Sequence, residues 1–242
     1  MTRRADHPAG AGAEVLDGSA YHRDVSHPLW PFFDLRVRTA RLELHLPTEH
    51  ELAMLAAVAR AGIHDDDQMP FAVPWSTLPS PDFEWGFIRH HWRSRGTWEP
   101  TDWELDMGVF VDSEPVGMQA VFATSFSRLR RVRSGSWLGR GSQGRGIGRE
   151  MRVAMLSLAF DGLGAEVAET EAFADNAASI GVSRSVGYED NGIDRLAPAG
   201  EPRDMIRFRM TRARWEQVRV ERAFPDVAID GLGPCLPLLG VG

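Results

Sequence analysis

The chain has 242 residues, of which 43% are hydrophobic and 25% are charged, and its formal net charge is -7. This balance predicts a globular protein with a sizeable core, and the overall negative charge argues against a general role in binding nucleic acid. The single cysteine, Cys235, excludes an internal disulfide framework and a cysteine-based zinc site. All 27 basic residues are arginine, so lysine Schiff-base chemistry and a Walker A phosphate loop are also excluded.

The N-terminal region carries no targeting signal that we recognise. Arg3 and Arg4 are not followed by an apolar stretch, so no signal peptide is predicted. No uncharged apolar run approaches the length of a membrane span. We therefore expect a cytoplasmic protein with neither a membrane nor a nucleic-acid partner.

The first third of the chain predicts a strand followed by two helices. Residues 1–31 lack periodicity and are expected to form a partly disordered N-terminal extension. Residues 36–46 alternate between polar and apolar, which predicts a strand. Thr48, with Glu51 three residues later, predicts a capping box at the start of a helix. After a polar loop and a proline-rich stretch, Asp82 is expected to cap a second helix.

The rest of the chain alternates between strands and helices without a regular βαβ repeat. The predicted strands are 103–111, 116–126, 134–138, 166–173 and 204–210, and residues 189–196 are expected to be strand or loop. The predicted helices are 151–160, 177–185 and 212–220. Residues 128–133 are expected to be a basic link. We predict an α/β (α+β) domain over residues 32–220, with a mixed sheet flanked by helices. The apolar tail, residues 221–242, is expected to pack on the domain or on a partner, which weakly favours a homodimer.

A glycine-rich loop, residues 139–150, joins a predicted strand to a predicted helix. Glycine allows close backbone approach, and the first N–H groups of a helix attract anions, so the junction predicts a phosphate site. Gly139, Gly141 and Gly144 match the dinucleotide pattern G-x-G-x-x-G. The motif lies mid-chain after three antiparallel strands, however, whereas a Rossmann domain has it at the first βα turn. The alternative to a ligand site is a flexible loop in which the glycines have no binding role.

A second pattern describes this loop better, namely Gln143-x-x-Gly146-x-Gly148. Together with residues 135–138 and 148–152, and with residues 175–179 and 182–188 further on, it resembles the GNAT superfamily of acyl-CoA-dependent N-acyltransferases. Within that superfamily it is most similar to the branch of ribosomal-protein-type N-acetyltransferases. Three further segments (33–39, 69–71 and 74–75) resemble an actinobacterial subgroup, some of whose members use succinyl-CoA.

The resemblance implies a GNAT fold, whose mostly antiparallel sheet is splayed at the coenzyme site. It further implies that the coenzyme pyrophosphate lies on the N–H groups of residues 144–149 and that pantetheine pairs with the open strand edge. The backbone N–H of Leu138 would polarise the thioester carbonyl, and Ser183 is the proposed acid. The implied coenzyme-binding residues are Trp137, Leu138, Gln143, Gly144, Arg145, Gly146, Ile147, Gly148, Arg149, Asn176 and Ser179.

The acceptor side is less defined by the sequence. Trp75, His64, Asp65 and Asp67 are the expected substrate-binding residues, and no metal is expected. The general base is left unassigned among His64, Asp65, Asp67, Glu104, Asp106 and Glu171. The implied function is transfer of an acetyl or succinyl group from acyl-CoA to a primary amine of a protein or small molecule. The alternative is a non-catalytic acyl-CoA sensor.

Overall fold

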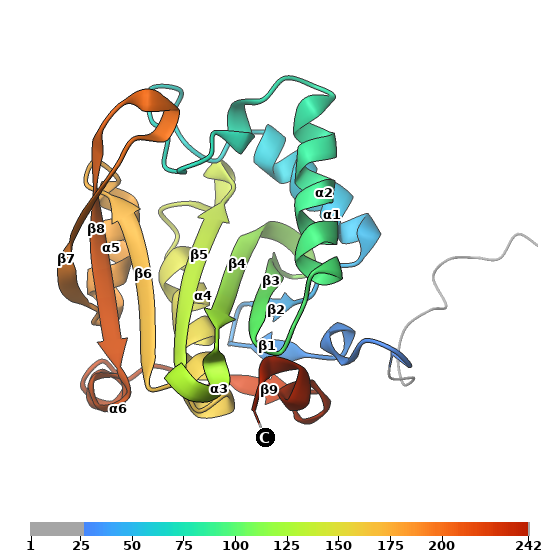
Figure 1. Cartoon of the computed structure of the whole chain (residues 1–242), viewed down its shortest axis with the longest axis vertical. Helices are drawn as coiled ribbons and strands as arrows, with labels where there is room; N and C mark the ends of the chain where they lie inside the picture. The colour runs from blue at the N-terminus through green and yellow to red at the C-terminus, as the bar shows by residue number, and fades with distance from the viewer. Residues whose placement is uncertain (1–26, 242) are drawn as a thin grey trace, which may run out of the picture.

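A computed structural model describes residues 27–241 of the chain and shows one mixed sheet with helices on both faces (Figure 1). Within these residues the sheet has nine strands in the order β7-β8-β6-β5-β4-β3-β2-β1-β9. The strands are β1 (Arg36–Arg38), β2 (Glu43–His45), β3 (Asp102–Val111), β4 (Glu114–Thr124), β5 (Arg131–Leu138), β6 (Val167–Phe173), β7 (Glu189–Leu196), β8 (Arg203–Thr211) and β9 (Ala228–Asp230). All neighbours pair antiparallel except β5 and β6, which are parallel. The predicted fold class is therefore confirmed.

The helices divide into two groups on opposite sides of the sheet. They are α1 (Glu49–Arg60), α2 (Asp82–Gly96), α3 (Phe126–Leu129), α4 (Ile147–Ser157), α5 (Ala177–Val186) and α6 (Arg212–Glu221). α1 and α2 lie over the β3–β4 part of the sheet and enclose a small apolar cluster with Met118 (Figure 1). The larger core lies on the other face, where α4 packs. Among the described residues, no helix covers the α1–α2 side of β5, β6 and β8 (Figure 1).

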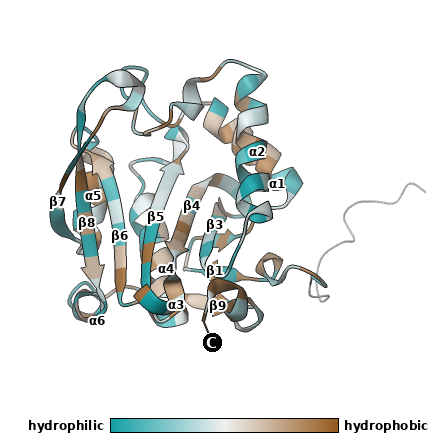
Figure 2. Cartoon of the chain, in the orientation of Figure 1, coloured by the Kyte–Doolittle hydropathy of each residue, from teal (hydrophilic) through white to brown (hydrophobic). Residues whose placement is uncertain are grey.

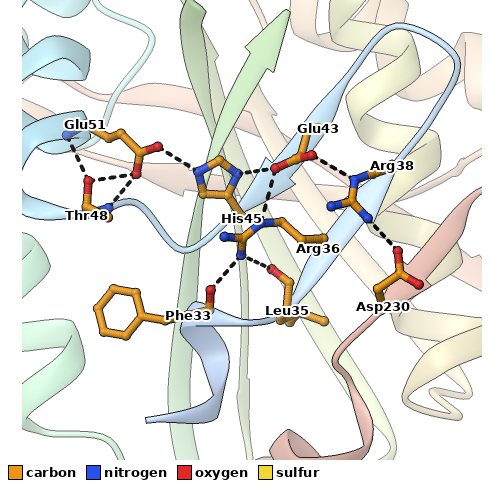
Figure 3. Close-up of polar contacts among 9 residues, drawn as sticks. All are labelled: Phe33, Leu35, Arg36, Arg38, Glu43, His45, Thr48, Glu51 and Asp230. Atoms are coloured by element: carbon orange, nitrogen blue, oxygen red, sulfur yellow. Dashed lines mark hydrogen bonds and ion pairs between the residues drawn. The ribbon is translucent and has the colours of Figure 1, made fainter. Parts of the chain in front are cut away.

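The start of α1 follows the sequence prediction. Thr48 and Glu51 form the predicted capping box, because the Glu51 N–H donates to Thr48 Oγ1 and the Thr48 N–H donates to Glu51 Oε2. Glu51 also binds His45, and His45 in turn lies beside Glu43 (Figure 3). Burial opposes ionisation of Glu51, but hydrogen bonds from His45 and Thr48 prevail and lower its pKa to about 2. This network links β2 to the start of α1.

Several predicted boundaries are wrong. Asp82 does not cap α2, because the helix begins at Asp82 itself after Pro81, with no side-chain cap. Its carboxylate still suits the positive end of the helix dipole. The expected basic link contains the short helix α3 and the start of β5 instead. α4 begins four residues earlier than predicted, at Ile147, and continues as a π-helical turn over Leu158–Gly162.

The tail extends the sheet and packs on its own domain. β9 pairs with β1, and the 3-10 segment Gly233–Leu239 buries Cys235 and Leu239. The indole N–H groups of Trp98 and Trp103 donate to two carbonyls of this segment. The tail therefore no longer supports a homodimer. The predicted disorder of residues 1–31 lies mostly outside the described residues, which begin at residue 27. No helix within residues 27–241 is long and apolar enough to cross a membrane.

Candidate active site

Strands β5 and β6 separate at the centre of the sheet. They pair only from Arg131 to Ser134 on β5 and from Val167 to Thr170 on β6. The last pair is closed by the Thr170 hydroxyl, which donates to the Ser134 carbonyl at 3.1 Å. β6 then continues along β8. Residues 135–138 of β5 therefore have an edge without a strand partner, which is the splay that the resemblance implied.

The hydrogen-bond pattern of β5 shows which peptide groups point to this edge. The Gly139 N–H donates to the Val116 carbonyl on the β4 side at 2.9 Å. Peptide groups along a strand alternate in direction, so Trp137 also faces β4, while Ser136 and Leu138 point to the open edge. The Leu138 N–H therefore faces the open edge, and its oxyanion role stays a prediction. Ser136 replaces Trp137 as the second backbone group on this edge.

The glycine loop has the geometry of an anion site. Gly144 and Gly146 have φ angles of 70° and 79°, in the left-handed region that favours glycine. α4 starts at Ile147, and its N-cap residue, Gly146, has no side chain to accept a hydrogen bond from the first turn. The N–H groups of Ile147, Gly148 and Arg149 lie in the first helical turn, where an α-helix offers no carbonyl partner. These donors and the helix dipole favour a phosphate at this end of α4.

Side chains around the loop hold it rather than face a ligand. Gln143 Nε2 donates to the carbonyls of Ile63 and Leu138 at 2.8 and 2.9 Å. Arg41 bonds both Glu150 and the carbonyl of the loop residue Arg145. Arg41 lies about a hundred positions upstream, and no sequence signal pointed to it.

The two arginines of the loop differ in direction. Arg145 is exposed beside the start of α4. The guanidinium of Arg149 lies 5.1 Å from the ring centroid of Phe224, in the C-terminal segment. Arg149 therefore offers the loop its backbone N–H, and its side-chain charge is turned toward the tail.

The segment between α1 and α2 crosses over the carboxyl end of β5 (Figure 1). Asp65 pairs with Arg140 at 2.7 Å, and His64 Nε2 bonds the Ser76 hydroxyl at 2.8 Å. Asp65 and His64 thus stabilise this segment, whereas Asp67 is exposed. The Trp75 ring lies 6.0 Å from that of Trp137. Of the four expected substrate residues, Trp75 is the one whose ring packs against β5.

The middle of the same segment contacts the β7–β8 hairpin. Arg203 on β8 donates through Nη1 to the Met69 carbonyl at 2.7 Å and through Nη2 to both carboxylate oxygens of Asp175. β8 alternates between hydrophilic and hydrophobic residues and β7 is mostly hydrophilic (Figure 2). The hairpin and the α1–α2 segment thus bound a polar approach to the open edge.

Asn176 and Ser183 already have partners within α5. Asn176 caps the helix by accepting the Ser179 N–H at 3.0 Å, which leaves the amide NH2 as a donor. Ser183 is 1% exposed, and its hydroxyl donates to the Ser179 carbonyl at 3.0 Å. To act as an acid, this hydroxyl would have to turn its proton away from the Ser179 carbonyl.

A group of acids and histidines lies under α2, on the sheet face that also carries Trp137. Asp106 on β3 is buried and lies 3.1 Å from His91 Nδ1 and 3.5 Å from His90 Nε2. Asp106 pairs with Ala120 on β4, and Ala120 pairs with Gly135 on β5. Two strand spacings, about 10 Å, therefore separate Asp106 from the open edge.

This group has perturbed protonation. Burial opposes ionisation of Asp106, but hydrogen bonds from both histidines prevail and lower its pKa to about 2. The same contact raises the pKa of His90. Burial and the negative charge of Asp106 raise the pKa of Glu104 to about 7. His90, His91 and Asp106 also place three potential ligand atoms within 4.8 Å of one another, and their hydrogen bonds explain this grouping without an ion.

A family model for the acetyltransferase (GNAT) domain matches residues 41–189. This chain belongs to the GNAT acetyltransferase family. The match spans the glycine loop, the open edge of β5 and the cap of α5. Family membership assigns the chain to the acyl-CoA-dependent acetyltransferases, for which acetyl-CoA is the co-substrate.

Solved structures share the fold at low sequence identity. A GCN5-related N-acetyltransferase from Brucella melitensis is 20% identical, with a TM-score of 0.62 over 76% of this chain and 82% of that one. Mycobacterium smegmatis RimJ, in complex with CoA-disulfide, is 16% identical, with a TM-score of 0.60 over 80% of this chain and 96% of that one. A Bacillus anthracis GNAT acetyltransferase is 12% identical, with a TM-score of 0.60 over 74% and 99%.

Proposed function

We propose that this protein transfers an acetyl or succinyl group from acyl-CoA to a primary amine of a protein or small molecule. The observation that carries the proposal is the open edge of β5 beside the uncapped start of α4. The pyrophosphate would bind the N–H groups of residues 144–149. The pantetheine arm would extend along Ser136 and Leu138 and receive a hydrogen bond from the Asn176 amide.

The reaction is direct attack of the amine on the thioester. The Leu138 N–H donates to the carbonyl oxygen and stabilises the negative charge that develops there. The amine approaches from the face that carries Trp137 and Trp75, where an added Cβ at Gly135 would meet no atom within 4 Å. That space leaves room for the attacking nitrogen next to the strand.

The amine must lose a proton, because a lysine side chain has an ordinary pKa near 10.4 and an α-amine one of about 7.7–8.0. Glu104 and the His90–Asp106 pair lie on the attacking face. A carboxylate whose pKa is about 7 is basic enough to accept this proton at neutral pH. Because about 10 Å separates these groups from the open edge of β5, the proton would pass through water.

The second candidate function is a non-catalytic acyl-CoA sensor. The position of Ser183 favours it, because the proposed acid is buried and bonded within its own helix. Two measurements separate the candidates. Acetyl-CoA and succinyl-CoA should raise the melting temperature while NADH and ATP do not, and the opposite pattern would refute both. Amine-dependent thiol release then identifies the enzyme, and tight binding without release with any amine identifies the sensor.

A further inference from the structure

An unpaired arginine lies behind the open edge of β5. Arg152, on the sheet side of α4, is 2% exposed. Its Nη2 donates to the Ser136 hydroxyl at 3.2 Å, while its Nε and Nη1 have no partner among the described residues. No ion pair within residues 27–241 includes Arg152. An arginine keeps its charge in proteins, so a positive charge is buried here without a counter-ion.

Other polar groups without partners surround this guanidinium. The Tyr188 hydroxyl lies beside Arg152 and Ser134 without hydrogen-bond geometry to either. The Ser134 hydroxyl is likewise buried and has no partner in the described structure. Burial raises the pKa of Tyr188, so its phenol stays neutral and cannot supply the missing negative charge. On β4, Gln119 Oε1, a neutral acceptor, is also unpartnered beside Ser136.

This cluster of unpartnered polar groups lowers the stability of the fold unless a ligand binds to it. A buried charge without a partner destabilises a fold, and each unsatisfied buried polar atom adds to that cost. The guanidinium fork has the shape that recognises a carboxylate, and hydroxyl groups can rotate to donate to the same oxygens. The chemistry of Arg152, Ser134 and Tyr188 thus fits a carboxylate.

The position of the cluster indicates which carboxylate reaches it. Ser136 and Leu138 point their peptide groups to the same open edge, about 7 Å apart along the strand. The coenzyme phosphates would lie beyond Leu138, at the start of α4, and the amine would arrive on the opposite face of the sheet. A group that reaches Arg152 therefore comes from the thioester itself, as the far end of the acyl chain. The methyl of an acetyl group lies one bond from the carbonyl carbon and is too short to reach Arg152.

We propose that Arg152, with the hydroxyls of Ser134, Ser136 and Tyr188, forms a buried subsite for the terminal carboxylate of the donor. The preferred donor is then a short dicarboxylic monoacyl-CoA, with succinyl-CoA as the probe. This inference rests on the proposed function. In the transfer, the amine nitrogen bonds the thioester carbon, the carbon–sulfur bond breaks and the sulfur leaves with the electron pair. The amine proton passes to the base, and the carboxylate stays ionised on Arg152.

Equilibrium binding tests the subsite without requiring turnover. We expect calorimetry to show succinyl-CoA binding at least about tenfold more tightly than acetyl-CoA to the full chain. Arg152→Met should abolish this preference and leave the affinity for acetyl-CoA within about twofold, because it removes the fork and keeps an apolar side chain of similar length. Arg131→Met, at an exposed arginine on the other face of the sheet, is the matched control and should keep the preference.

A second variant guards against misfolding of the first. Tyr188→Phe keeps the ring and should reduce the preference for succinyl-CoA about threefold to tenfold. If acetyl-CoA and succinyl-CoA bind equally to the unmodified chain, or if Arg152→Met and Tyr188→Phe both keep the preference, the subsite is refuted while the proposed function stands. If neither coenzyme A nor either thioester binds, the proposed function itself fails.

Discussion

Replacing Leu138 by proline removes the one backbone donor that the proposed mechanism needs. The Leu138 N–H points to the open edge, whereas the ladder to β4 runs through neighbouring peptide groups, including Gly139 to Val116. Proline therefore costs no hydrogen bond of the sheet, which is the situation in which a strand accepts it. Leu138→Ala is the matched control, because it loses a similar part of the side chain, which packs near Gly148, but keeps the N–H.

The expected effect on rate is large. Removal of one oxyanion donor costs about 100-fold to 1,000-fold in kcat, or about 2.7–4 kcal/mol. Both variants lose part of a half-buried side chain, which we expect to lower stability by about 1–2 kcal/mol in each. The difference between them therefore isolates the N–H. Steady-state thiol release gives kcat, and calorimetry gives the affinity for acetyl-CoA, which should change little. Equal kcat values for the proline and alanine variants would refute the oxyanion assignment.

Three further variants test the loop, a helix cap and the half-buried acid Glu104. Gly144→Ala should weaken acyl-CoA binding about fivefold to thirtyfold, because alanine costs about 1–2 kcal/mol at a φ of 70° and the variant loop therefore relaxes away from the binding conformation. Gly141→Ala, at an open position without that φ, should stay within about twofold in the same titration. Thr48→Ala removes the capping box and should cost about 1 kcal/mol, seen as a melting temperature lower by about 2–4 °C. Glu104, with a pKa raised to about 7, stabilises the fold below its unfolded pKa of about 4.3 and loses that contribution as the pH rises to 7. Glu104→Gln should therefore reduce the loss of unfolding free energy between these pH values by about 1–2 kcal/mol, after discounting for partial exposure. The melting temperature should then fall less steeply with pH, and an unchanged pH dependence would contradict the raised pKa of Glu104.

Local patterns predicted the parts of the fold that depend on near neighbours in the sequence. Thr48 and Glu51 lie three positions apart, so the cap of α1 could be read directly, whereas the cap of α5 by Asn176 emerged from the structure. The glycine loop was likewise recognisable, because its conformation is set by its own residues. Asp82 misled, because the residue type suits a cap but α2 begins at Asp82 itself, after Pro81.

The parts that sequence could not predict depend on residues distant along the chain. Arg41 reaches Glu150, and Arg203 reaches Met69, across more than a hundred positions each. Arg152 looked like one more polar residue of an amphipathic helix, and only the packing shows that it is buried without a partner. Periodicity reports which face of a helix is buried, but it does not report what a buried charge meets.

The proposed reaction moves an acyl group from coenzyme A on the open edge of β5 to an amine. The most direct test incubates the full chain with acyl-labelled acetyl-CoA and succinyl-CoA, in turn, against a panel of peptides with free N-termini, lysine peptides and small amines. Mass spectrometry then locates the label. We expect label on the amine of at least one acceptor, in amounts that Leu138→Pro reduces and Leu138→Ala largely keeps. Tight binding of both donors with no label on any amine would contradict it and leave the sensor as the function.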